Sequence, residues 1–201
     1  DSLRLAVRHF ILSSALFRRR QQGKTQMVVH TYKEIAYHKK IYSWIDQYIK
    51  ELKDCLEDAL IGDDEVARIH FLKVYEKCFS EEIRKNNPFS KELIKDMYAV
   101  LRRCGVAMQN GRDLGTRDAI KHKLHQIYVG AQLLERGITF DHLLTTYFTR
   151  WARTGGNMDT NLQRARWFGY RSSYIELCKL FTTETIASEF SFLVNLSSSL
   201  K

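Results

Sequence analysis

The sequence predicts an α/β fold with a largely parallel sheet of five strands and a large helical insertion. Short apolar runs alternate with polar or helical stretches in the second half of the chain, and one further apolar run lies near its start. Strands that are separated by helices form parallel sheets with right-handed crossovers. The predicted strands centre on residues 27–29, 106–108, 127–129, 143–148 and 176–181.

The first predicted element is a buried helix over residues 2–20, where Leu, Val, Ile and Phe dominate and charges interrupt only occasionally. A polar turn over residues 21–25 leads into the first strand, which contains Met27-Val28-Val29. The turn contains Gly23-Lys24-Thr25, which resembles the end of a phosphate-binding loop. Such a loop follows a strand and opens a helix. Because this triplet precedes a strand, we do not interpret it as a phosphate-binding site.

Residues 34–104 have helical periodicity, which predicts a helical insertion between the first and second strands. The first of its helices has apolar residues at three- and four-residue steps, namely Ile35, His38, Ile41, Ile45, Tyr48, Leu52, Leu56 and Ala59. Gly62 ends this helix, and Asp63 with Asp64 caps the next one. The apolar stripe predicted for that helix consists of Val66, Ile69, Leu72, Tyr75 and Phe79.

The last helix of the insertion follows a chain break at Asn86-Asn87-Pro88. Proline cannot continue a helix, and serine is a favoured residue at the start of one. Ser90 is therefore the predicted cap. The apolar residues of this helix are Leu93, Ile94, Met97 and Leu101.

The composition limits the class of protein. The 201 residues contain 32 basic and 23 acidic side chains, for a net charge of +9. This excess favours nucleic acid as a partner over the alternative that charge only aids solubility. Four scattered cysteines form no Cys-x-x-Cys pair, so we expect reduced core residues in a cytoplasmic protein. No apolar run approaches the ~18 residues of a membrane helix, and the initial Asp1 predicts a piece of a longer chain.

Two segments of the second half carry the candidate chemistry. Residues 163–171 read Gln-Arg-Ala-Arg-Trp-Phe-Gly-Tyr-Arg, and residues 130–143 read Gly-Ala-Gln-Leu-Leu-Glu-Arg-Gly-Ile-Thr-Phe-Asp-His-Leu. Guanidinium groups are planar and permanently charged, and they clamp phosphate oxygens in a way that lysine does not. Nucleotide-driven motors need such a clamp at the phosphates that they cleave.

These segments resemble the fifth and sixth motifs of superfamily-two helicases. They resemble more closely the Z-one domain family of bacterial and phage proteins, which are often labelled endonucleases and linked to restriction-like defence. The pentad Trp167-Phe168-Gly169-Tyr170-Arg171, the run Thr146-Tyr147-Phe148-Thr149-Arg150 and the strand Met27-Val28-Val29-His30-Thr31 match the patterns of that family. The resemblance implies a RecA-like C-terminal helicase lobe built from residues 1–33 and 105–201, with residues 34–104 inserted.

In superfamily-two motors, ATP and Mg²⁺ are held mainly by an N-terminal lobe, and the second lobe supplies an arginine finger. The resemblance therefore implies that this chain is the second lobe of a DNA-dependent ATPase and is inactive alone. Arg166 and Arg171 are the finger candidates, and Gln163 shares a helical face with Arg166. The implied nucleotide contacts are Arg136, Gly137 and Thr139. The implied partners are DNA, with RNA left open, the N-terminal lobe, and proteins of a defence system.

Two departures from the family pattern motivate an alternative function. Ala165 replaces a glycine, and its methyl group crowds a backbone that must approach phosphate closely. Glu135 puts a negative charge where a hydroxyl is usual. The alternative is a catalytically degenerate module that binds nucleic acid or a protein partner.

The predicted nucleic-acid contacts combine cations with neighbouring aromatic residues. They are Thr31, Lys33, Arg150 and Arg153, which lie beside Tyr32 and Trp151. Phosphate neutralisation gives affinity that does not depend on sequence, and stacking accepts any base. A solvated edge of the fold is the competing interpretation of both clusters.

A metal-dependent nuclease needs clustered carboxylates that hold magnesium and activate water. The nearest set, Asp46 with Glu51 and Lys53, lies on the strongest helical pattern and cannot easily make that geometry. His122 and His125 lack companions, and we interpret them as a surface pair. The sequence predicts no metal site and no nuclease here, which leaves only a nuclease elsewhere in a longer protein.

Overall fold

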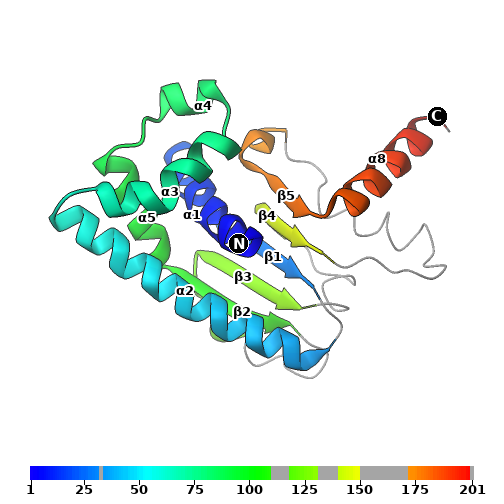
Figure 1. Cartoon of the computed structure of the whole chain (residues 1–201), viewed down its shortest axis with the longest axis horizontal. Coiled ribbons are helices and arrows are strands. Elements are labelled where there is room, and N and C mark those ends of the chain that lie inside the picture. The colour runs from blue at the N-terminus through cyan, green and yellow to red at the C-terminus, as the bar shows by residue number, and fades with distance from the viewer. Residues whose placement is uncertain (32–33, 110–117, 131–139, 150–171, 200–201) are drawn as a thin grey trace.

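The computed structural model describes residues 1–31, 34–109, 118–130, 140–149 and 172–199. Within these residues, five strands form one all-parallel sheet in the order β2-β3-β1-β4-β5 (Figure 1). The strands are β1 (Thr25–His30), β2 (Cys104–Gln109), β3 (His125–Gly130), β4 (Leu143–Phe148) and β5 (Lys179–Thr182). The predicted α/β class and parallel sheet are confirmed, and the layout is consistent with a RecA-like fold.

The first strand in sequence is the central strand of the sheet. β1 pairs with β3 from Thr25 opposite His125 to His30 opposite Gly130. On its other side β1 pairs with β4, with a register shift between Gln26 and Met27. All residues of β1 and β3 are buried, as expected for parallel strands covered on both faces. Because every pairing is parallel, the carboxyl ends of all these strands meet at one edge.

The predicted N-terminal helix is α1 (Ser2–Arg20), and its residues from Phe10 to Phe17 are all buried. Its last turn carries Arg18, Arg19 and Arg20, where cations suit the negative end of the helix dipole. The Arg19 Nε atom lies 2.7 Å from a carboxylate oxygen of Asp96, and Arg20 pairs with Glu176. α1 is therefore a core helix whose end is tied to two distant parts of the chain.

Four helices occupy the described chain between β1 and β2. They are α2 (Ile35–Ile61), α3 (Glu65–Cys78), α4 (Glu81–Asn86) and α5 (Lys91–Arg102). α2 runs beside β2, and most of its predicted stripe is buried, although Ile35 is exposed (Figure 1). As predicted, Ser90 caps α5 by accepting a hydrogen bond from the Leu93 amide. The division into a lobe (1–33 and 105–201) and an insertion (34–104) stays a prediction.

The apolar stripe predicted for α3 is correct at its end, where Tyr75 and Phe79 are buried, and wrong at its start. Val66 and Ile69 are 46% and 70% exposed. The buried residues that the prediction missed are Ala67, Phe71 and Val74. Phe71 and Tyr75 are the bulkiest apolar side chains available at a four-residue spacing, and burying them removes the most surface from water. The helix therefore turns that face inward and leaves two smaller apolar residues in solvent.

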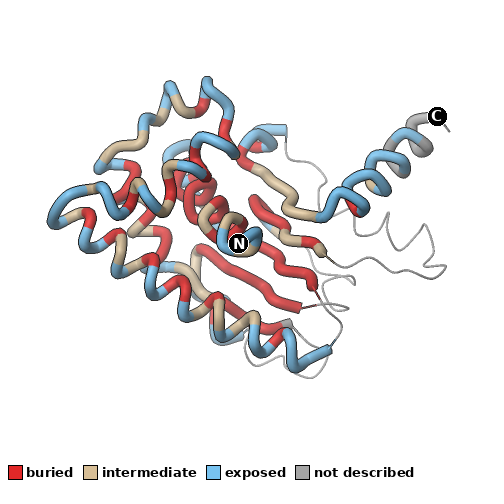
Figure 2. Tube along the Cα trace, in the orientation of Figure 1, coloured by how far each residue is buried: buried red, intermediate tan, exposed pale blue. Residues whose placement is uncertain are grey.

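The two faces of the sheet are covered by different helices. Met27 and Val29 pack in one core with α1, α2, α3 and α5. Val28 packs on the opposite face in a second core, which includes Ile186 and Phe190 of α8 (Glu184–Ser199). Figure 2 shows the central strands fully buried, whereas most of α8 is exposed.

The last strand is shorter than predicted, because the 3₁₀ helix Ile175–Leu177 occupies the start of the predicted segment. All four cysteines are free and partly buried. In the part of the chain that the structure describes, no helix combines the length and apolarity needed to cross a membrane.

Candidate functional site

The topology of the sheet singles out the carboxyl end of β1. In open parallel sheets, ligands bind outside the carboxyl ends of the strands where the strand order reverses. From β1 the chain passes through α2–α5 to β2 on one side, whereas β4 and β5 lie on the other side. The reversal therefore occurs at β1, which ends at His30 with β3 and β4 as neighbours.

Side chains and backbone tie the ends of β1 and β4 together. The His30 ring stacks on the Phe148 ring, with centroids 4.8 Å apart and planes inclined by 25°. The Thr149 amide donates a hydrogen bond of 3.1 Å to the His30 carbonyl. These contacts fix the position of the next residue along the chain, Thr31.

Two buried hydroxyl groups at this edge have no partner among the described residues. They are Oγ1 of Thr31, which follows β1, and Oγ1 of Thr182, which ends β5. A buried polar group without a hydrogen bond costs about 1–3 kcal/mol. Thr31 is only 3% exposed. The carboxyl edge thus offers two unused hydrogen-bonding groups at the position where the topology predicts a ligand.

The opposite edge contains a buried polar cluster that joins α1, β1 and β3. Thr25 Oγ1 lies 2.7 Å from Ser14 Oγ and 2.7 Å from His125 Nδ1. All three residues are 0% exposed. Burial, followed by the positive charges of Arg18 and Arg103, lowers the pKa of His125 to about 4. Hydroxyl–imidazole pairs also occur in nucleophilic sites, but no substrate reaches groups this deeply buried.

This cluster corrects the prediction for His122 and His125 as a surface pair. His122 is exposed, but His125 is the first residue of β3 and lies in the core. A hydroxyl partner makes that burial tolerable, because the neutral imidazole keeps one hydrogen bond. Nothing local in the sequence announces that partner, since Thr25 and Ser14 lie far away in the chain.

Gly23-Lys24-Thr25 lies at the amino end of β1, as predicted. Thr25 is the first residue of the strand, and the Lys24 ammonium donates to the Lys121 carbonyl at 3.2 Å. The triplet is therefore at the edge opposite to the candidate ligand site. A phosphate-binding loop needs the carboxyl end of a strand, so the triplet is no such loop.

The carboxylates considered for a nuclease lie on α2, as predicted. Asp46 forms an ion pair of 2.8 Å with Lys50, and Glu51 accepts a hydrogen bond from Gln47. Across the described ranges, no group of three or more His, Cys, Asp and Glu residues could hold a metal ion.

The sequence matches the model of one known protein family. A model of the Z1 domain matches residues 2–201, which is nearly the whole chain. The chain belongs to the Z1 domain family. The resemblance based on the Trp-Phe-Gly-Tyr-Arg motif is therefore correct at the level of the family. Neither the curated proteins nor the solved structures contain a match.

Most predicted site residues of this Z1 domain lie outside the described residues. They are Gln163, Arg166, Arg171, Arg136, Gly137, Thr139, Lys33, Arg150 and Arg153. Their roles stay predictions. Thr31 is described, and it lies at the carboxyl end of β1. Chain connectivity adds one fact: residues 131–139 follow the last residue of β3, and residues 150–171 follow Thr149 after β4.

Proposed function

We propose that this Z1 domain is the C-terminal motor lobe of a helicase-like, DNA-dependent ATPase, with a role in restriction-type defence. One observation carries the proposal. β3 and β4 flank β1 and end at the same edge of the sheet, and the two arginine-bearing segments begin at those strand ends. Ligands of parallel sheets bind at that edge.

The chemistry assigned to the domain is electrostatic. ATP with Mg²⁺ supplies the reacting phosphoryl group, which the N-terminal lobe of the intact protein binds. Arg166 and Arg171, positioned with Gln163, bring permanent positive charge to the γ-phosphate as its negative charge grows. Arg136, Gly137 and Thr139 contact the nucleotide and transmit its state to bound nucleic acid.

The described edge fits a phosphate ligand in one respect. Thr31 Oγ1 is buried beside the strand end and has no partner among the described residues. A hydroxyl donates readily to a phosphate oxygen. Thr31 also directly precedes the segment with Lys33, and Arg150 and Arg153 follow the adjacent strand. We propose these residues as the contacts to nucleic acid.

The decisive experiment replaces the finger in the intact protein. Arg166→Ala should lower DNA-stimulated ATP turnover by a factor of about 10³–10⁵, the range attributed to arginine fingers. ATP binding should change little, because the N-terminal lobe provides most contacts. A steady-state turnover assay and a fluorescent-nucleotide titration measure the two quantities. Arg102→Ala removes an exposed arginine at the end of α5 and is the matched control. Normal turnover in Arg166→Ala would exclude this assignment.

Ala165 and Glu135 support a second candidate, a degenerate module that binds nucleic acid or a protein partner. The two functions differ in a single measurement on the intact protein. A motor hydrolyses ATP faster when DNA is added, whereas a degenerate module binds DNA without any turnover. Ala165→Gly, which restores the family glycine, should raise turnover if crowding at the phosphate is what limits it.

A further inference from the structure

A basic cavity lies between α1, α3 and the carboxyl ends of β4 and β5. Its volume is about 610 Å³, within the range of about 300–1,000 Å³ typical of ligand pockets. Five cationic side chains line this α1–α3 cavity together with one acidic residue, Asp1. The cations are Arg4 and Arg8 of α1, Lys73 and Lys77 of α3, and Lys179 of β5.

The positive charge of the cavity is not neutralised by carboxylates. Among the described residues, none of the five cations forms an ion pair. Instead, Arg8 donates to the Tyr48 hydroxyl at 2.5 Å, and the guanidinium carbons of Arg4 and Arg8 each lie 5.8 Å from the Tyr48 ring centre. These contacts hold both guanidinium groups near one aromatic ring, although like charges repel. An anion bound in the cavity would reduce that repulsion.

Lys77 and Lys179 line the same cavity although they come from different elements. Burial raises the pKa of the Cys78 thiol, whereas the positive charges of Lys179 and Lys77 both act to lower it. Cys78 lines the same cavity as these two lysines. Cations that three separate elements bring to one cavity form a site for more than one anionic group.

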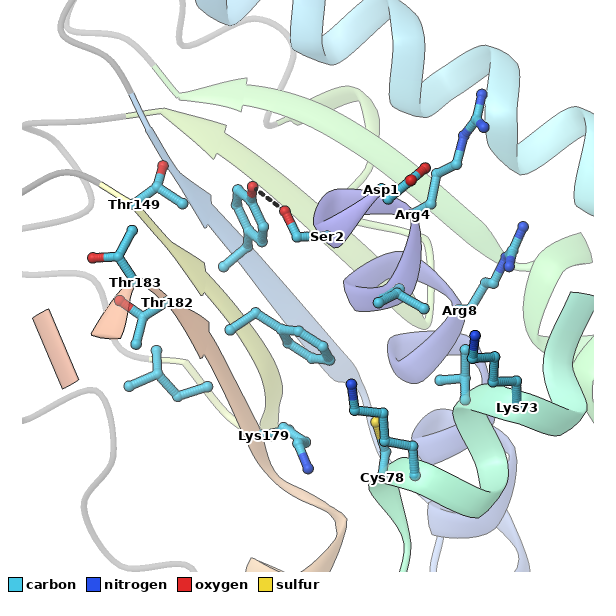
Figure 3. A pocket seen from close by; sticks show the side chains of 16 residues that line it. Asp1, Ser2, Arg4, Arg8, Lys73, Cys78, Thr149, Lys179, Thr182 and Thr183 are labelled. Atoms are coloured by element: carbon cyan, nitrogen blue, oxygen red, sulfur yellow. Dashed lines mark hydrogen bonds between the residues drawn. The ribbon is translucent and has the colours of Figure 1, made fainter. Parts of the chain in front are cut away.

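The cavity reaches the edge of the sheet where the nucleic-acid contacts are predicted. Thr149, Thr182 and Thr183 line it at the carboxyl ends of β4 and β5, on the side away from Arg4 and Arg8 (Figure 3). Thr149 directly precedes Arg150, and the buried Thr182 Oγ1 has no partner within the described ranges. Hydroxyl groups at one end and cations at the other suit a ligand with repeated phosphate groups.

We propose that the α1–α3 cavity binds successive phosphate groups of a nucleic-acid strand. The assignment deepens the proposed function, because it names a part of the strand path that no motif marks. Tyr147 and Phe181 also line the cavity and add aromatic surface on which bases stack, which an acidic peptide would not use. The volume also exceeds what a single phosphate group needs.

The test removes three lining ammonium groups in the intact protein. Lys73, Lys77 and Lys179 are replaced by alanine together, and the matched control replaces the exposed Lys39, Lys85 and Lys95, which do not line the cavity. Both variants lose the same net charge. The probe is a fluorescent single-stranded DNA of about 16 nucleotides, followed by anisotropy without ATP over a series of salt concentrations.

We expect the lining variant to bind at least about tenfold more weakly, with a salt slope that is smaller by about two, because each lost phosphate contact reduces it by about 0.7. The control should stay within about twofold of the unsubstituted protein. Replacement of the same three lysines by arginine should restore affinity, and thermal unfolding of each variant checks that the fold is intact.

Three results would overturn the assignment. The first is an equal loss of strand affinity in the two triple variants, and the second is no strand binding by the unsubstituted protein. The third is a lining variant that binds the strand normally and loses affinity only for polyglutamate or for free ATP. The test is separate from hydrolysis, since Arg166→Ala should bind the strand normally. If the lining variant loses strand binding while Arg166→Ala keeps normal turnover, the cavity assignment is supported and the motor assignment is contradicted. If the lining variant binds the strand normally while Arg166→Ala loses turnover, only the motor assignment is supported.

Discussion

His9 and His125 are uncharged histidines held in the core. His9 is 1% exposed, lies 2.8 Å from Thr145 Oγ1 through Nδ1, and stacks on Phe79 at 5.1 Å. Burial, followed by the positive charge of Lys179, lowers its pKa to about 3. Burial also lowers the pKa of His125, to about 4. Protonation of either ring would place a charge where no carboxylate is found among its described neighbours.

This burial predicts acid sensitivity. Both folded pKa values lie below the ordinary value of 6.5, so the unfolded chain takes up protons that the folded chain refuses. The stability that neutral histidines contribute is complete above pH 6.5 and falls as the pH drops toward 4. At pH 5 each histidine should reduce the unfolding free energy by about 2 kcal/mol relative to pH 7.5.

Urea unfolding at both pH values measures the loss. His125→Asn keeps a polar partner for Thr25 and should remove roughly half of the acid effect. His122→Asn changes an exposed histidine and should leave the acid effect as it is. An identical pH dependence in His125→Asn and the unsubstituted protein would show that His125 does not titrate between these values.

At the scale of elements, serine caps determine where two short helices begin. Ser80 Oγ accepts from the Ile83 amide at 3.3 Å, and Ser90 Oγ accepts from the Leu93 amide at 3.5 Å. Each bond satisfies a donor that the first turn of a helix leaves without a partner. α5 depends on its cap because its buried face, from Leu93 to Leu101, packs against both α1 and α2.

Ser90→Ala should lower the unfolding free energy by about 1 kcal/mol, whereas Ser90→Gly should cost only a few tenths of that. The urea midpoint should shift while the slope of the transition stays constant. Ser188→Ala in α8 is the control, because the partner of that hydroxyl among the described residues is the Glu184 carbonyl of its own helix. An equal loss in both variants would mean that capping is not the cause.

The periodicity of apolar residues predicted the positions of helices and strands better than it predicted which helix face is buried. The strand segments were predictable because Met27 and its neighbours form apolar runs that are buried on both sides of the sheet. The inward face of α3 was not, because Val66 and Phe71 fit helical stripes equally well and only the tertiary packing chooses between them. The buried position of His125 also escaped prediction, since a polar residue at the start of a strand normally indicates solvent.

At the scale of the molecule, motifs indicated the family but not the cavity. The arginine segments are contiguous in sequence, so a motif reveals them, although Arg136 and Arg166 lie outside the described residues. The α1–α3 cavity draws Arg4, Lys73 and Lys179 from three distant parts of the chain. No local pattern connects these cations, and only the fold brings them together.

The position of β1 predicts that a shortened chain aggregates. A chain of residues 1–142 lacks β4 and β5, which leaves the β4-facing side of β1 as an open sheet edge. Open edges pair with other chains, so light scattering should rise at concentrations where the full chain stays clear. In that short chain, Val28→Pro should reduce scattering, because amides of even-numbered residues such as Gln26 face β4. Equal scattering would exclude edge pairing as the cause.

The same arrangement constrains how the protein is made in the cell. Of the five strands described here, β1 leaves the ribosome before the others, and its partner residue His125 follows Thr25 by 100 positions. At roughly 5–20 residues per second, translation keeps the central strand waiting for about 5–20 s. During that interval the stretch from α1 to β1, whose apolar residues are buried in the finished fold, lacks its final neighbours. A chaperone that shields this stretch should therefore raise the yield of native protein.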